Sequence, residues 1–397
     1  MTSRAWVDEA DRGADRRLPE FARRSHQLPA WAAQPEKTDA QTGAAAGVKR
    51  WRDEGLDALL ARTEPLLTSR HDRQHAAVPP VLSVLPLPRD TARSVQWHRN
   101  GQLAIVGGNH HIYLFHAAGR FVEQISKTDV LKRVEHAVLG ATGEDVVVVG
   151  HQSYTPDLLN LSTGTITPLK FLCTRDSALY RNGRRDNGKQ DFYITKVIVQ
   201  TNDAASRTVG VVSGATVTIG SLASGSITHR IEMSDPVQDV TFSSGSNELT
   251  VATRNKLTVY DVRKTARFLR ETNDDGTVDI TTFANTDAAF AVGSASGVVS
   301  VYGKDGTNAG PLRTLKNLTT SISCLSFGER SNGDTVLAYA TRGQKGGFRL
   351  AVLPECRVVP SFPAVEQRHQ FIQSLTIAPT IPVLSVGEKQ KVTNYAL

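Results

Sequence analysis

Short apolar runs separated by turn-forming residues recur along most of this chain. The stretch 278–327 shows the pattern clearly, because runs of Val, Ile, Thr, Phe and Tyr alternate there with clusters of Gly, Asn, Asp and Ser. This texture is typical of strands joined by tight turns. An apolar run that ends in an aromatic residue at Phe283 returns at Phe327, about one repeat later. The pattern predicts a β-meander that repeats along the chain.

The repeat can be followed from residue 81 to residue 397. We place the end of the first strand of each unit at Trp97, Val138, Val199, Phe242, Phe283, Phe327 and Ile377. These positions are separated by 41, 61, 43, 41, 44 and 50 residues. A four-stranded propeller blade takes about 40 to 45 residues. The spacing therefore predicts an all-β protein with a seven-bladed β-propeller over residues 81–397.

The last unit lacks one strand. After Ile377 only two apolar runs remain, at 383–386 and 392–397. We expect the strand 81–87, from the start of the domain, to complete this blade. A ring closed in this way leaves no open edge between its first and last blades.

The strand at 110–116 shows strict alternation. Ile112 and Leu114 are predicted to face one side of it, while Tyr113 and Phe115 face the other. The sequence indicates the number of repeats more clearly than their subtype. Only one unit carries a pair, Tyr260-Asp261, where a WD repeat has Trp-Asp. We interpret the domain as a divergent WD-repeat propeller.

Residues 1–80 have a different texture, rich in Ala, Arg, Asp and Glu and without strand alternation. Such a segment buries too little apolar surface to offset the entropy of ordering, so we predict a largely extended tail. Apolar islands at 5–9, 28–32 and 55–67 interrupt it. The candidates for docking to other proteins are Trp6, Val7, Trp31, Leu59 and Leu60. Trp contributes large apolar area and an N–H donor, although the islands could equally pack against the propeller.

Charge adds a mild preference for acidic partners such as nucleic acid. The net charge is +7, from 46 basic and 39 acidic residues. The tail is not a basic arm, since residues 1–80 hold 13 Lys and Arg against 12 Asp and Glu, and the rest of the chain holds 33 against 27.

The long interval between the second and third blades contains a polar loop at 172–193. Four basic residues cluster in it: Arg181, Arg184, Arg185 and Lys189. Phosphate contacts need only Lys and Arg on an exposed segment, so these residues are candidate contacts to RNA phosphates. Three Asp residues are interleaved with them, which favours the alternative of a solvated loop.

The sequence contains no recognisable catalytic or cofactor motif. Phosphate loops of the GxxxxGK[ST] and GxGxxG types, HExxH and GxSxG do not occur. The adjacent His110 and His111 would point to opposite faces of a strand and could not share a metal ion. Cys173, Cys324 and Cys356 form no CxxC pair, so we expect small core residues in a reducing compartment. We predict neither an enzyme nor a cofactor or metal site.

Apolar runs stay well short of the roughly 18 residues of a membrane span. Charges stand near the first residues, where a secretory signal would place its apolar segment. We therefore expect a soluble intracellular protein with no membrane contact and no small-molecule substrate.

Several segments resemble one known family in the same order. The runs 293–302 and 311–322 are similar to the join between the fifth and sixth blades of the U3 small nucleolar RNA-associated protein 18 family. The strand at 94–98 resembles its first blade, with Trp97 where Phe is usual, and 348–350 resembles its sixth. Tail segments resembling that family's N-terminal elements are 5–9, 29–32 and 59–67. The resemblance covers nearly the whole chain.

This resemblance implies a non-catalytic scaffold. Members of the family are WD-repeat proteins of the UTP-B subcomplex of the small-subunit processome, which works on pre-ribosomal RNA in the nucleolus. It implies as partners the other UTP-B proteins, the U3 small nucleolar ribonucleoprotein and pre-ribosomal RNA. The alternative is a WD-repeat adaptor or substrate receptor of a ubiquitin ligase, because one fold serves many functions. A propeller enzyme would need convergent polar groups at the ring axis, which the sequence does not indicate.

Overall fold

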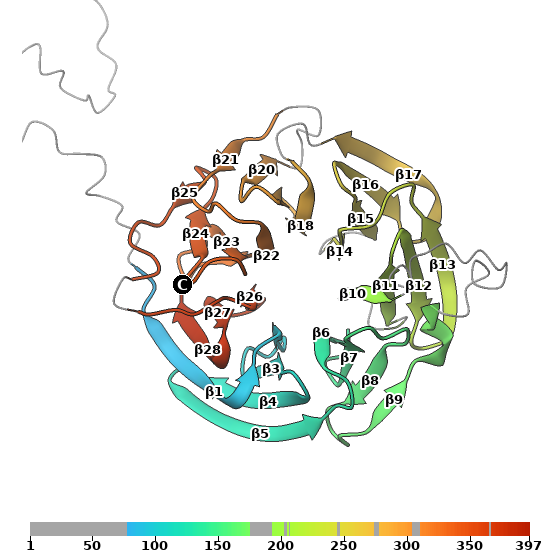
Figure 1. Ribbon diagram of the computed structural model, residues 1–397, viewed down its shortest axis with the longest axis horizontal. Coiled ribbons are helices and arrows are strands. Elements are labelled where there is room, and N and C mark those ends of the chain that lie inside the picture. The colour runs from blue at the N-terminus through green and yellow to red at the C-terminus, as the bar shows by residue number, and fades with distance from the viewer. Residues whose placement is uncertain are drawn as a thin grey trace, which may run out of the picture. The chain divides into compact units, whose positions relative to one another are not determined.

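The computed structural model describes residues 78–174, 193–201, 205, 207–243, 247–273, 278–303, 310–364 and 367–397. Within these residues the strands form seven antiparallel sheets of four strands each. The sheets surround a common axis like the blades of a propeller (Figure 1). The predicted all-β, seven-bladed propeller is therefore confirmed. Residues 1–77 of the predicted tail and most of the loop at 172–193 lie outside the described residues.

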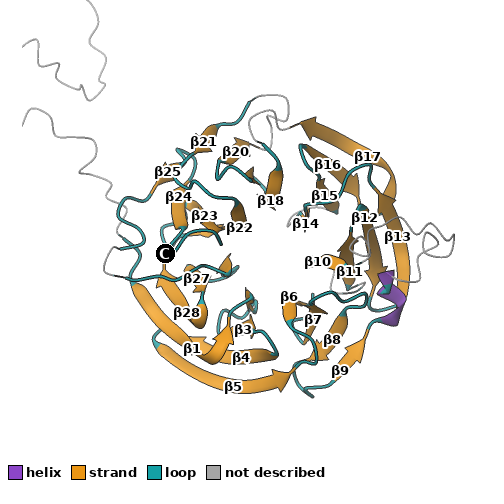
Figure 2. Cartoon of the chain, viewed as in Figure 1, coloured by secondary structure: helices purple, strands orange, loops and turns teal. Residues whose placement is uncertain are grey.

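Each blade runs from the ring axis to the rim in four strands (Figure 2). The inner strands are β2 (Ser94–Trp97), β6 (Val134–Leu139), β10 (Ile194–Val199), β14 (Asp239–Phe242), β18 (Ile280–Asn285), β22 (Ile322–Glu329) and β26 (Ser374–Ile377). The second strands are β3 (Leu103–Gly107), β7 (Asp145–Gly150), β11 (Thr208–Ser213), β15 (Glu248–Ala252), β19 (Ala289–Ser294), β23 (Thr335–Thr341) and β27 (Val383–Gly387).

The third and fourth strands form the outer half of each blade. The third strands are β4 (His111–Ala118), β8 (Asp157–Asn160), β12 (Thr216–Ser221), β16 (Lys256–Asp261), β20 (Val299–Gly303), β24 (Phe348–Val352) and β28 (Lys389–Ala396). The rim strands are β5 (Phe121–Asp129), β9 (Ile166–Pro168), β13 (Ser226–Glu232), β17 (Lys264–Asn273), β21 (Arg313–Leu315), β25 (Arg357–Val358) and β1 (Val81–Thr91). A 3₁₀ turn, η4 (Lys170–Leu172), follows β9. We number the blades from the one that contains β2 to the one that contains β26.

The second strands explain the apolar runs of the sequence. Every residue of β7, β11 and β27 is buried, because each sheet packs against a blade on both of its faces. Rim strands such as β5 and β17 are mostly exposed. A strand buried on both faces reads as a continuous apolar run, whereas a rim strand reads as polar.

The core consists of seven apolar clusters in the described residues, one between each pair of neighbouring blades. The predicted alternation in the strand at 110–116 is confirmed by them. Ile112 and Leu114 lie in the cluster shared with blade 2. Tyr113 and Phe115 lie in the cluster shared with blade 7. Packing between blades, rather than one central core, therefore holds the ring together.

Blade 7 is built from the two ends of the propeller. The sheet order is β1-β28-β27-β26, and Val84 of β1 pairs with Thr393 of β28 (Figure 1). The pairing runs on to Thr91, beyond the 81–87 segment that the apolar pattern marks. Pro86 and Pro88 lie on the exposed side of β1, which is a rim strand, where Pro is tolerated.

Candidate functional site

One end of the ring carries two kinds of connection, and we call it the turn face. Here each rim strand leads to the next inner strand, and each second strand turns into the third. Backbone hydrogen bonds of 2.7 to 3.0 Å join the two kinds of connection at six of the seven junctions within the described residues. They run from Val134 N to Asn109 O, Ile194 N to Ser153 O, Val237 N to Gly214 O, Ile280 N to Arg254 O, Gly346 N to Gln370 O and Ala92 N to Glu388 O.

The two ends of the ring differ in charge. Described residues in the connections of the turn face include the basic residues Arg93, Lys132, Arg133, Lys170, Arg254, Lys316, Arg342, Lys345 and Arg368. The acidic residues there are Asp235, Asp279 and Glu388. Described connections at the opposite end hold Arg99, Arg120, Arg207, Arg263 and Arg330 against Glu144, Asp287, Asp334 and Glu355. The turn face therefore carries most of the positive excess of these connections.

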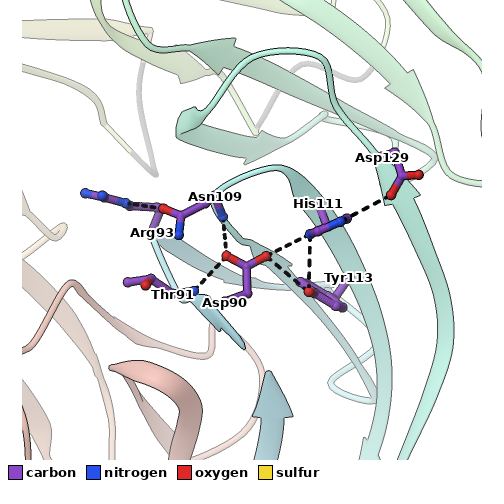
Figure 3. A network of polar contacts seen from close by, with 7 residues as sticks. All are labelled: Asp90, Thr91, Arg93, Asn109, His111, Tyr113 and Asp129. Carbon is purple, nitrogen blue, oxygen red and sulfur yellow. Dashed lines mark hydrogen bonds and ion pairs between the residues drawn. The ribbon is translucent and has the colours of Figure 1, made fainter. Parts of the chain in front are cut away.

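A buried carboxylate organises the turn face where blade 7 meets blade 1 (Figure 3). Asp90, which is 4 % exposed, accepts hydrogen bonds from Thr91 N at 2.7 Å and Asn109 N at 2.6 Å. Its other oxygen accepts from the Tyr113 hydroxyl at 3.1 Å and lies 2.9 Å from His111 Nδ1. These contacts fix the turn between β3 and β4 against the end of β1.

The Asp90 carboxylate stays ionised because of these contacts. Burial acts to raise its pKa, but the hydrogen bonds from Asn109, His111, Thr91 and Tyr113 outweigh burial and lower the pKa below its ordinary value. Burial and the Asp90 charge in turn raise the pKa of Tyr113 to about 12. Glycine is required beside the carboxylate, since a Cβ at Gly108 would lie 2.3 Å from Asp90 Oδ2.

The network also positions a cation. Asn109, held by Asp90, accepts a hydrogen bond of 3.2 Å from Arg93 Nε (Figure 3). The side chain of Arg93 extends away from Asp90 in this view. The buried network is therefore a clamp that presents Arg93 at the turn face.

Three arginines from separate connections interact electrostatically at the turn face. Burial, together with the positive charges of Arg133 and Arg342, lowers the pKa of Arg93, and Glu135 and Asp90 only partly oppose them. Arg342 donates from Nε and Nη2 to the carbonyl of Gln373, at 3.1 and 3.0 Å. Arg133 Nη2 lies 3.6 Å from Glu135, and its Nε is buried without a hydrogen-bond partner in the described part of the chain.

The inner strands extend this positive region. Burial, and then the charges of Lys196 and Arg342, lower the pKa of His136 on β6 to about 4. Lys196 on β10 pairs with Asp239, the first residue of β14. Asp239 also accepts from Phe283 N at 2.8 Å on blade 5. One carboxylate thus joins blades 3, 4 and 5 near the start of their inner strands.

Aromatic rings accompany the cations on this face. Tyr154 and Tyr193 pack together with ring centroids 4.6 Å apart, at the junction of blades 2 and 3. Phe371, 42 % exposed, lies between blades 6 and 7, and Lys345 Nζ is 5.8 Å from its ring centroid. Both groups belong to connections of the turn face.

A second carboxylate, histidine and tyrosine group lies between blades 6 and 7. Glu388 contacts Nδ1 of His369, and His369 Nε2 lies 2.7 Å from the Tyr395 hydroxyl. Glu388 and His369 are 0 % and 3 % exposed, so the group is closed to a substrate and holds the blades together. Among the residues that the structure describes, no three His, Cys, Asp or Glu side chains are placed to share a metal ion.

A cavity of about 690 Å³ opens at the opposite end, between blades 6 and 7. The chain enters the described propeller there at Pro79 and Pro80, and Ala396 and Leu397 lie beside them. The remaining walls come from 352–360 and 330–334.

No helix within the described residues has the length and apolar character needed to cross a membrane.

Comparison with known proteins gives one consistent set of relatives. The chain is 24% identical over 319 residues to the U3 small nucleolar RNA-associated protein 18 homolog of Mus musculus, covering 77% of this chain and 54% of that protein. It is 25% identical to the Homo sapiens homolog over 317 residues, 77% of this chain and 53% of the human protein. The predicted resemblance to this family is confirmed.

The similarity to the U3 small nucleolar RNA-associated protein 18 family has clear bounds. A fission yeast member, from Schizosaccharomyces pombe, is 33% identical, but over 134 residues that cover 32% of this chain and 25% of that protein. The chain spans about half the length of the human and mouse relatives it matches. No family model matches the chain.

The site residues predicted from the sequence all lie outside the described residues. They are the docking candidates Trp6, Val7, Trp31, Leu59 and Leu60 and the basic residues Arg181, Arg184, Arg185 and Lys189. The described ends of the basic loop, Thr174 and Tyr193, belong to a connection of the turn face.

Sequence reasoning missed the arginines of the turn face. Arg93 and Arg133 each come directly before an inner strand, and Arg342 comes directly after a second strand. Arg93 is the only charge in its connection, while Arg133 follows Lys132 and Arg342 shares its connection with Lys345. The three arginines are therefore scattered along the sequence, and no single cluster marks them. Aligning the blades on their first strands would have shown the shared position of Arg93 and Arg133.

Proposed function

We propose that this protein is a non-catalytic scaffold of the small-subunit processome, within the UTP-B subcomplex, and that it acts in nucleolar processing of pre-ribosomal RNA. The observation that carries the proposal is a seven-bladed ring whose sequence is similar, over 77% of the chain, to proteins named for their association with U3 small nucleolar RNA. A propeller offers two faces and a rim, which suits it to hold several partners at once. The partners proposed are the other UTP-B proteins, the U3 ribonucleoprotein and pre-ribosomal RNA.

Affinity purification of the tagged full-length protein from its own cells tests this proposal. UTP-B proteins and U3 small nucleolar RNA should co-purify, and the tagged protein should concentrate in the nucleolus. Recovery of ubiquitin-ligase subunits without any processome protein would overturn the proposal in favour of the adaptor alternative. Depletion of the protein should lower the amount of small-subunit ribosomal RNA.

The tail islands give a sharper experiment on protein docking. We propose that Trp6 and Trp31, with Val7, Leu59 and Leu60, anchor the chain to other UTP-B proteins. Trp6→Ala with Trp31→Ala should reduce recovery of these proteins, whereas Trp51→Ala, a tail tryptophan outside the predicted anchors, should not. Equal recovery with all variants would contradict this assignment and leave the propeller as the docking unit.

The loop at 172–193 is proposed to contact RNA phosphates through Arg181, Arg184, Arg185 and Lys189. Arg184→Ala with Arg185→Ala should lower the dependence of RNA binding on salt, because fewer counterions are released on binding. Arg120→Ala with Arg263→Ala removes the same charge from the opposite end of the ring and is the matched control. An unchanged salt slope in the loop variant would remove the phosphate assignment.

A further inference from the structure

We infer that the turn face binds single-stranded RNA directly along an arc from blade 6 through blades 7 and 1 to the junction of blades 2 and 3. The inference rests on the proposed function and deepens it. The cationic arc consists of Arg342, Arg93 and Arg133, with Phe371 at one end and the Tyr154 and Tyr193 pair at the other. These residues follow one another around the ring at successive blade junctions.

The arginines supply the phosphate contacts. Guanidinium groups present several N–H donors in a planar fork that matches phosphate oxygens. Arg342 is exposed, and the Arg133 side chain is 41 % exposed. Glu135 is the acidic neighbour of Arg133. Its Oε1 lies 3.6 Å from Arg133 Nη2, so this ion pair engages only part of the guanidinium group. Three like charges gathered at one face favour a polyanion over a single carboxylate.

The hydrogen bonds around Arg93 and Arg342 hold both side chains in place before RNA binds. Arg93 is held by Asn109, which is held in turn by the buried Asp90, so ordering Arg93 on binding costs little side-chain entropy. Arg342 is likewise fixed by two bonds to the Gln373 carbonyl. At the opposite face, by contrast, Arg120 is exposed in a two-residue turn.

The aromatic residues favour RNA over an acidic peptide, and a single strand over a duplex. Unpaired bases stack on aromatic side chains, and basic residues interleaved with aromatics are typical of single-strand binding. Tyr154 and Tyr193 already pack together beside the connection to blade 3. Phe371 presents its ring next to Lys345, so a base there could stack beside a cation. Both ends of the arc therefore offer surfaces that an acidic peptide would not need.

Fluorescence anisotropy with the purified full-length protein tests the inference. The probes are a labelled oligouridylate of about twelve nucleotides, within the usual site size of roughly 4 to 16, a duplex RNA of equal length, and a poly-glutamate peptide. The arc variant carries Arg93→Gln, Arg133→Gln and Arg342→Gln. The control variant carries Arg99→Gln, Arg120→Gln and Arg263→Gln on the opposite face. Thermal unfolding of each variant shows whether it is folded.

The wild type should bind oligouridylate in preference to the duplex and the peptide. The arc variant should lower the slope of log affinity against log salt by about 2, since each single-strand phosphate contact contributes roughly 0.7, and the control variant should leave it unchanged. Tyr193→Leu should weaken binding by about tenfold with an unchanged salt slope, because it removes stacking but no charge. If the triple variant does not fold, Arg133→Gln alone should lower the slope by about 0.7.

Equal losses in the arc and control variants, or preferred binding of poly-glutamate, would overturn the inference. So would binding that neither variant changes. These outcomes are separable from the proposed function, because UTP-B proteins could still co-purify with a protein whose arc does not bind RNA. Conversely, tight binding by the arc without recovery of UTP-B proteins would leave the arc standing and reject the processome assignment.

Discussion

The indole Nε1 of Trp97 donates a 2.8 Å hydrogen bond to the hydroxyl of Ser385, although the two residues are separated by 288 positions in the sequence. The bond joins the inner strand of blade 1 to the second strand of blade 7. Ser385 in turn donates to Asn394, and Asn394 donates to Ser83. A polar chain thus runs through the blade that closes the ring, where it fixes the register of segments from both ends of the propeller.

Trp97→Phe should destabilise the propeller modestly. It removes a hydrogen bond, worth about 1 kcal/mol, and some buried volume, but Ser385 keeps Asn394 as a partner. We expect a loss of roughly 1 to 3 kcal/mol in the free energy of unfolding, measured by denaturant titration. Trp97→Ala should cost clearly more because it leaves a cavity. Equal stability of the two variants would show that Trp97 packs loosely between the blades.

The closing strand can be tested by comparing its two faces. Leu85 is fully buried in the cluster between blades 7 and 1, whereas the neighbouring Val84 is 45 % exposed. Leu85→Ala should cost about 2 to 5 kcal/mol of stability, and Val84→Ala should cost well under 1 kcal/mol. Similar values for both variants, measured by denaturant titration, would contradict closure of the ring by this strand.

Asp90→Asn should weaken the junction in a pH-dependent way. The folded state lowers the pKa of Asp90 below its ordinary 3.8, so the carboxylate contributes stability above that pH and loses it as the pH falls through the folded value. At pH 7 the variant should be less stable by about 1 to 3 kcal/mol. The difference from the wild type should shrink below about pH 4. If the difference in the free energy of unfolding between the variant and the wild type stays constant over this range, the loss comes from the changed shape of the side chain rather than from its charge.

Gly297 should tolerate no side chain. It has a φ of +84°, and a Cβ there would lie 2.6 Å from the carbonyl oxygen of Leu318. Gly297→Ala should therefore cost several kcal/mol, from a backbone clash added to the roughly 1 to 2 kcal/mol of a left-handed conformation. Gly119 is the control, because its φ is +61° and its Cβ would meet nothing within 4 Å. Gly119→Ala should lose only the stability that the left-handed conformation costs. Equal losses of stability in the two variants would mean that the loop at Leu318 moves aside.

The sequence was informative about the ring and silent about the arc for physical reasons. Second strands such as β7, β11 and β27 are buried on both faces, so their apolar runs and the turns beside them repeat at one spacing. Rim strands such as β5 face solvent and read as polar, which hides them from the same pattern. The charged arc forms no local cluster in the sequence because Arg93, Arg133 and Arg342 come from three connections that only the closed ring brings together. The clamp around Asp90 is hidden likewise, since its donors come from β1, β4 and a turn 19 residues away.

Protonation of His136 should destabilise the ring at mildly acidic pH. Burial, followed by the charges of Lys196 and Arg342, lowers its pKa to about 4 from an ordinary value of 6.5. The unfolded chain therefore binds a proton between these values and the folded protein does not, so stability contributed by neutral His136 is present above pH 6.5 and falls toward pH 4. His136→Asn carries no titrating group, and it should lose less stability than the wild type over this range, by on the order of 1 to 3 kcal/mol. Denaturant titrations at several pH values measure the difference, and parallel curves for the two proteins would show that the folded ring does not hold His136 neutral.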